Sequence, residues 1–175
     1  MARLPYARLD TPDVRPLVDR IVAERGSVLH LYQMLLHSPP LAEGWLNFLT
    51  AVRHKLDLPG GLRELVIMRV ASLNGAPYEA EQHAPIALKE GITQAQLDAL
   101  ADWPAQRDTY SADQRAVLAL CDSMTRDIHV PAEVMAALVT ALGQRQAVEM
   151  TATIAAYNMV SRFLEAIQIH STDVR

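Results

Sequence analysis

The chain has very little cysteine, since Cys121 is the one thiol among 175 residues. A single thiol excludes an internal disulfide framework and suits a reducing cytosol. The N-terminus also lacks the continuous apolar stretch of a secretory signal. No window reaches the roughly 18 apolar residues that a membrane span needs. We therefore expect a soluble, cytoplasmic protein with no membrane partner.

Signals for nucleic-acid, metal and cofactor binding are also missing. The net charge is −4, aromatic residues make up 5% of the chain, and no basic cluster occurs, so no nucleic-acid partner is expected. His30 and His37 stand two helical turns apart, about 10 Å, which is too far to share one metal ion. No His-Glu-x-x-His motif, glycine-rich phosphate loop or Gly-x-Ser-x-Gly turn is present. We expect neither a metal nor a cofactor.

Helical periodicity runs through nearly every long segment. Half of the residues are hydrophobic and 21% are charged, which is typical of one soluble domain with a substantial core. No segment alternates convincingly with period two, so no strand is expected. The expected helices span residues 11–26, 27–37, 40–56, 62–73, 77–90, 93–103, 111–127, 131–142 and 144–169. The prediction is an all-α, compact helical domain of eight to nine helices.

The middle of the chain predicts a helical hairpin. Residues 62–73 are apolar on nearly all sides, as in a buried central helix. Asn74-Gly75 should end that helix, and Pro77 suits the first turn of the next one. Further along, Gly143 predicts a break between the last two helices.

Glu79 and His83 are the strongest candidates for acid–base chemistry. Because they are four residues apart, they share one helix face, where a carboxylate can orient an imidazole that titrates near neutrality. Glu64, at the start of the preceding helix, is the third candidate catalytic residue. Plainer interpretations stay open, because a Glu–His pair on a solvated face is common. A Glu in a first helical turn is also favoured by the helix dipole, by about 0.3–1 kcal/mol.

The candidate substrate-binding residues are Arg69, Tyr78, Tyr157, Asn158 and Arg162. Arg69 interrupts the apolar helix, so its guanidinium either pairs with a carboxylate such as Glu64 or Glu79, or contacts an anionic substrate. The last three residues of this set form a polar strip with Glu165 on the final helix. That strip either lines a pocket or is a solvated face.

This pattern resembles the carboxymuconolactone decarboxylase and alkylhydroperoxidase D superfamily. The motifs that carry the resemblance are the lead-in segment 30–58, the core helix from Arg63 to Ala71, Tyr78-Glu79 with His83, Gly91-Ile92-Thr93, and the ending 157–164. In the peroxidase branch a Cys-x-x-Cys pair stands where this chain has Ala76 and Glu79. The resemblance therefore favours the branch that lacks the pair, in which a Glu one turn before the His is found.

The resemblance implies an all-α, alkylhydroperoxidase D-like fold that assembles as a dimer, trimer or hexamer. It implies a domain at 28–170, preceded by an N-terminal helical extension at 1–27 and followed by a tail at 171–175. It also implies a proton relay that includes Glu64 and His83. The favoured function is a carboxymuconolactone decarboxylase-like enzyme that uses Glu/His acid–base chemistry on a small carboxylated lactone or keto acid, by decarboxylation or a related proton transfer.

Two other functions stay open. The first is a catalytically silent, oligomeric binding or stress-response module of the same fold. The second is a peroxidase-like antioxidant protein that depends on Cys121, although such a cycle needs two thiols and a lone buried thiol is usually inert. An enzyme requires Glu79 and His83 to face a cavity, whereas the module tolerates them facing water or an interface.

Overall fold

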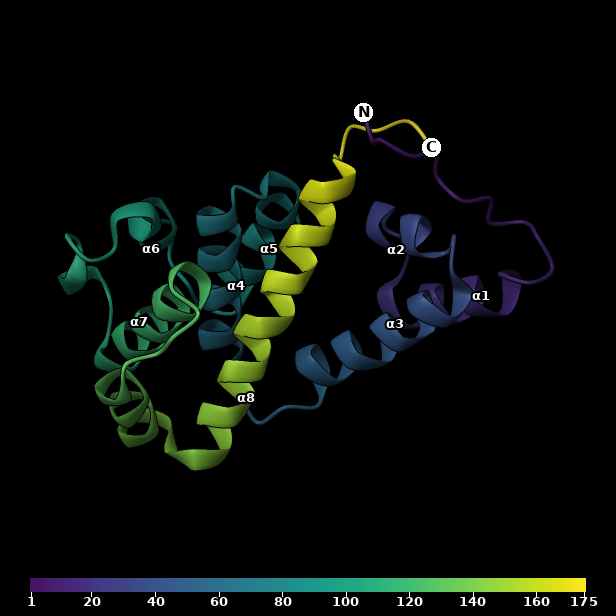
Figure 1. The fold of residues 1–175 in the computed structure, drawn as a ribbon. Coiled ribbons are helices and arrows are strands. Elements are labelled where there is room, and N and C mark those ends of the chain that lie inside the picture. The colour runs from purple at the N-terminus through teal and green to yellow at the C-terminus, as the bar shows by residue number, and fades with distance from the viewer. The chain divides into compact units, whose positions relative to one another are not determined.

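The computed structural model describes residues 1–175, and it is helical, with no strand (Figure 1). The elements are α1 (Arg15–Arg25), α2 (His30–Leu35), α3 (Pro39–His54), α4 (Gly60–Asn74), α5 (Pro77–Lys89), α6 (Gln94–Ala99), the 3-10 helices η1 (Leu100–Asp102) and η2 (Arg107–Thr109), α7 (Ala112–Arg126) and α8 (Ala132–Ile167). The all-α prediction is confirmed. None of the helices combines the length and apolar character needed to cross a membrane.

The start of the first helix differs from the prediction, whereas the break near Gly143 agrees with it. The first helix begins at Arg15 and not at Thr11. An earlier start would place Pro16 in a helix interior, where its missing N–H removes a backbone hydrogen bond. The expected break at Gly143 is confirmed, because this residue interrupts α8 with φ 78° and ψ 167°.

The chain divides into two compact units. The first comprises Met1–Leu56 and Leu164–Arg175, and the second comprises Asp57–Phe163. The expected division at residues 27/28 and 170/171 follows other boundaries and stays a prediction. All of the candidate site residues lie in the second unit.

Helix α4 is the centre of the second unit, and it packs against α5 and α7. Its core side chains are almost fully excluded from solvent: Leu65, Val66, Ile67, Val70 and Ala71. Such an element has apolar residues on nearly all sides because it has no solvent-facing side to cover. The predicted buried helix is thus confirmed.

The turn between α4 and α5 folds the chain back on itself. Gly75 adopts φ 60° and ψ 43°, a left-handed conformation that glycine reaches without a Cβ clash. The N–H of Ala76 then donates to the carbonyl of Ala71 at 2.9 Å, and Pro77 begins α5 at a position where its missing N–H costs nothing. Helices α4 and α5 therefore lie side by side (Figure 1).

Candidate acid–base site

Glu64 lies deeper in its helix than the sequence suggested. Because α4 begins at Gly60, Glu64 is in the second turn and not in the first, so the helix dipole is a weak explanation for it. Its side chain is 1% exposed. A carboxylate buried to this degree needs partners that offset its lost hydration.

His83 supplies one of these partners and lies between two carboxylates. Its Nδ1 atom is 2.6 Å from Oε2 of Glu64, and its Nε2 atom is 3.3 Å from Oε1 of Glu79. Glu79 and His83 are each 4% exposed as whole residues, so the pair does not face water. The hairpin therefore brings together the three residues that the sequence indicated, with Glu64 and not Glu79 as the closer partner.

Arg63 adds a positive charge to the cluster. Its Nε donates to Oε1 of Glu64 at 3.0 Å. Burial opposes ionisation of Glu64, but the hydrogen bonds and charges of His83 and Arg63 outweigh that effect and lower the pKa of this carboxyl group. With a protonated imidazole, two positive groups (Arg63 and His83) balance two negative groups (Glu64 and Glu79), which makes the buried cluster neutral.

The arrangement suits proton transfer. An imidazole whose two nitrogens both face carboxylate oxygens can hold a proton on either side, and a fixed partner on Nδ1 controls the orientation of the ring. The ring of Tyr157 on α8 packs edge-on against that of His83, with centroids 5.2 Å apart and planes at 90°. The imidazole is therefore held by groups from three helices.

Arg69 pairs with a carboxylate, which was one of the two expectations for it, but the partner differs from the two that the sequence suggested. Its Nε and Nη2 donate to the two carboxylate oxygens of Asp122 on α7, at 2.7 and 2.8 Å. Its Nη1 donates to the carbonyls of Leu100 and Ala101, at 2.8 and 3.0 Å. The partner is thus neither Glu64 nor Glu79, and the guanidinium joins α4 to α7 and η1. These contacts use four of the five N–H donors of the guanidinium.

Asn158 also holds helices together. Its Nδ2 lies 3.0 Å from Oγ1 of Thr125 and 3.1 Å from the carbonyl oxygen of Ile154. Its Oδ1 accepts a hydrogen bond of 3.0 Å from Nδ2 of Asn74, at the end of α4. These contacts connect α8 with α4 and α7, and they occupy both ends of the amide.

The other candidate substrate contacts occupy different environments. Tyr157 is buried beside His83, and Tyr78 is buried in the first turn of α5. Arg162 is exposed on α8. Of the five candidate substrate-binding residues, Tyr157 is the one with a ring contact to His83. The sequence did not indicate Arg63 as a partner of Glu64. Its position directly before Glu64 in the chain was the signal that could have revealed it.

Cys121 is buried and makes a weak contact of 3.8 Å from its Sγ to the carbonyl of Val66. Burial raises the pKa of this thiol to about 12, so it carries almost no thiolate at neutral pH. No group of three His, Cys, Asp or Glu side chains has the arrangement of a metal site.

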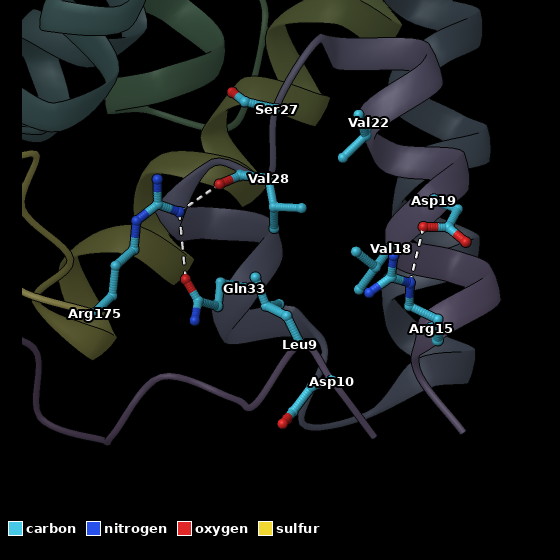
Figure 2. A pocket seen from close by; sticks show the side chains of 10 residues that line it. All are labelled: Leu9, Asp10, Arg15, Val18, Asp19, Val22, Ser27, Val28, Gln33 and Arg175. Atoms are coloured by element: carbon cyan, nitrogen blue, oxygen red, sulfur yellow. Dashed lines mark hydrogen bonds and ion pairs between the residues drawn. The ribbon is translucent and has the colours of Figure 1, made fainter. Parts of the chain in front are cut away.

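A pocket of about 840 Å³ lies in the first unit (Figure 2). Val18, Val22 and Val28 give it an apolar surface. On one side Arg15 pairs with Asp19 at 3.1 Å, so the positive charge there is already balanced. None of the candidate site residues lines this pocket.

Comparison with solved structures finds several proteins of similar fold. The alkylhydroperoxidase AhpD core protein from Ralstonia eutropha, an uncharacterised peroxidase-related protein, has a TM-score of 0.83 and 21% identity, over 98% of this chain and 93% of that one. A variant of the debrominase Bmp8 in complex with 2,3,4-tribromopyrrole gives a TM-score of 0.78 and 21% identity, over 95% and 89% of the two chains. A protein of unknown function from Agrobacterium tumefaciens, a proposed AhpD antioxidant defence protein, gives 0.73 and 18%, over 79% and 95%.

These likenesses show a shared fold. No curated protein matches the chain. The model of the carboxymuconolactone decarboxylase family matches residues 39–122, a range that contains Glu64, Glu79 and His83. The positions of the Cys-x-x-Cys pair hold Ala76 and Glu79. Residues 39–122 therefore match the carboxymuconolactone decarboxylase family model, and the chain has the alkylhydroperoxidase D-like fold without that cysteine pair.

Proposed function

We propose that this protein is an enzyme that transfers protons through Glu64, His83 and Glu79, acting on a small carboxylated lactone or keto acid. The observation that carries the proposal is the buried imidazole whose two nitrogens each contact a carboxylate, at 2.6 and 3.3 Å. Buried ionisable groups that perturb one another are a recurrent feature of acid–base sites.

The two distances suggest different roles for the carboxylates. Glu64, the closer partner, orients the imidazole and stabilises its charged form. Glu79 makes the longer contact with Nε2, so it is the partner that a substrate can displace. His83 Nε2 would then deliver or accept the proton, and Glu79 would hold a proton or a substrate hydroxyl nearby.

Decarboxylation balances with these groups. The bond between the substrate carbon and its carboxylate breaks and releases CO2, and the electron pair passes into an adjacent carbonyl as an enolate. The imidazolium of His83 gives its Nε2 proton to that carbon, and a proton from solvent restores it. A well-placed acid–base group contributes about 10²- to 10⁴-fold to such a step.

Two comparisons support the proposed substrate class, and the first is the match to the carboxymuconolactone decarboxylase family model. A protein of the same fold binds 2,3,4-tribromopyrrole, which supports a small cyclic ligand here. We assign Tyr157 and Tyr78 to the walls of the substrate site and Arg162 to its carboxylate. Arg69 and Asn158 are left out because other helices already engage their polar atoms.

Proton NMR in D2O with a panel of carboxylated lactones and β-keto acids tests the proposal. Loss of CO2, or entry of deuterium at a substrate carbon, should occur with the native protein and disappear in His83→Ala. His129→Ala is the matched control, because His129 is exposed in the connection between α7 and α8. Identical behaviour of the native protein and His83→Ala across the panel would overturn the assignment.

One observation favours the silent module as second candidate. The cluster is nearly closed to solvent, so the same contacts could serve only to hold α5 on α4. In that case His83→Ala lowers the free energy of unfolding and changes no reaction. The buried single thiol argues against the peroxidase-like alternative. We retain homo-oligomerisation as a proposal for either function, to be measured by light scattering.

A further inference from the structure

The acid–base cluster continues to the protein surface through a chain of alternating charges. Beyond Glu64 stands Arg63, and beyond Arg63 stands Glu90, whose Oε1 is 3.9 Å from Nη2 of Arg63. We call Glu90, Arg63, Glu64, His83 and Glu79 the charge chain. Its side chains are 39%, 15%, 1%, 5% and 5% exposed, so it runs from solvent into the core.

The outer end of the charge chain is fixed by the start of α4. The carboxylate of Glu90 lies against Gly60, the first residue of the helix, where a Cβ would collide with it. Exposed helical N–H groups favour an anion at this place. Gly60 therefore leaves the space in which Glu90 can reach Arg63.

We propose that Arg63 is a positioning residue of the acid–base site, held by Glu90, which keeps Glu64 anionic and directed at His83. The inference rests on the proposed function for its catalytic meaning. Its physical basis is separate: Oε2 of Glu64 contacts His83 while Oε1 accepts from Arg63, so the carboxylate is fixed from both sides. Without Arg63, a buried Oε1 would lose its donor, and Glu64 would gain stability by taking up a proton.

Other charged groups near α4 do not substitute for Arg63. From α5 and its end, His83, Glu79 and Glu90 belong to the charge chain itself. From α7, Asp122 is bound by Arg69 and Trp103, and α8 contributes the ring of Tyr157. Arg63 is thus the permanent cation that pairs with Glu64, since a guanidinium stays protonated in proteins.

The test is the titration of the Glu64 side-chain carboxyl carbon by 13C NMR, which needs no substrate. In Arg63→Gln the midpoint should move to a pH about one unit or more higher. Arg63→Lys keeps the positive charge, so the Glu64 midpoint in this variant should lie close to that of the native protein. Glu90→Gln should raise the midpoint less than Arg63→Gln does. Arg145→Gln is the control: Arg145 is an exposed arginine in the same unit that pairs with Glu149, and its replacement should leave the midpoint unchanged.

An unchanged Glu64 midpoint in folded Arg63→Gln overturns the inference. If that variant does not fold, Gly60→Ala is tested in its place, because the added Cβ displaces the Glu90 carboxylate. The Glu64 midpoint should then rise as well, and an unchanged midpoint would contradict the role of Glu90. Where a substrate is turned over, the acid limb of kcat/KM should move with the midpoint and return in Arg63→Lys. Absence of turnover would concern the proposed function alone, because the titration is read without it.

Discussion

Nδ1 of His83 and Oε2 of Glu64 lie 2.6 Å apart, although the two residues are 19 positions apart in the chain. The contact joins α5 to α4 inside the second unit, directly across the turn at Gly75. It holds an imidazole and a carboxylate at a fixed distance in a buried site. Turnover and the pH dependence of stability should both depend on this contact between Glu64 and His83 and on the helix packing that maintains it.

The two carboxylates of the cluster should contribute unequally to turnover. Glu64→Gln removes the closer partner of the imidazole, so we expect kcat/KM to fall by about 10²- to 10⁴-fold. Glu79→Gln should cost less, because its contact is the longer one. Steady-state kinetics on the substrate found by NMR provides the comparison, with exposed Glu81→Gln on α5 as control. A larger loss in Glu79→Gln would reverse the assigned roles.

Stability should depend on pH through Glu64. The pKa of Glu64 in the folded protein is below its ordinary value of 4.5, so the unfolded chain binds the proton more tightly. The contribution to stability is therefore complete above about pH 4.5 and is lost as the pH falls through the folded pKa. Urea unfolding should show a difference between the native protein and Glu64→Gln that shrinks on acidification. A difference independent of pH would contradict the lowered pKa.

Arg69 should matter for stability and not for chemistry. Arg69→Met leaves Asp122 without its main partner and the carbonyls of Leu100 and Ala101 without a donor, and breaking such a buried pair costs about 3–5 kcal/mol. Since Asp122 is 19% exposed, we expect the lower end. Urea unfolding followed by far-UV circular dichroism gives the value. The control is Arg145→Met, which removes an exposed arginine from its ion pair with Glu149 and should lower the free energy of unfolding by under about 1 kcal/mol. A similar loss in Arg69→Met and Arg145→Met would contradict the structural role of Arg69.

Cys121 should be unreactive in the folded protein. With a pKa of about 12, only about one thiol in 10⁵ is ionised at pH 7. Alkylation by iodoacetamide should be slow until urea unfolds the chain, and Cys121→Ala should keep the acid–base reaction intact. Fast labelling of the native protein, or hydroperoxide reduction that disappears in Cys121→Ala, would restore the peroxidase-like alternative.

The sequence predicted the helical hairpin that brings Glu64, Glu79 and His83 together. Apolar residues on all sides of 62–73, the Asn74-Gly75 turn and Pro77 are local signals, and local signals determine where helices begin and end. The sequence predicts a helix start at Thr11 because Thr-Pro is a common helix-initiating pair. The helix begins at Arg15 because Pro16 fits the first turn of a helix and not its interior.

The partners of charged groups were harder to predict. Arg69 was expected to pair with Glu64 or Glu79, but Asp122 lies beside it because α7 packs on α4. Asn158 had the spacing of a pocket residue, yet it holds Asn74 and Thr125. Spacing along a helix tells which face a residue is on, and it does not tell which element covers that face.

The sequence by itself therefore determined the all-helical class and the hairpin, and it indicated Glu64, Glu79 and His83 as the candidates for acid–base chemistry, because helix periodicity and turn chemistry depend on neighbours in the chain. Only the tertiary structure decided that Glu64 is closer to His83 than Glu79 is, that Arg63 completes the cluster, and that Arg69 is structural. These relations depend on which atoms come within hydrogen-bonding distance when separate helices pack, and hydrogen bonds and ion pairs in a buried site change with differences of a few tenths of an ångström.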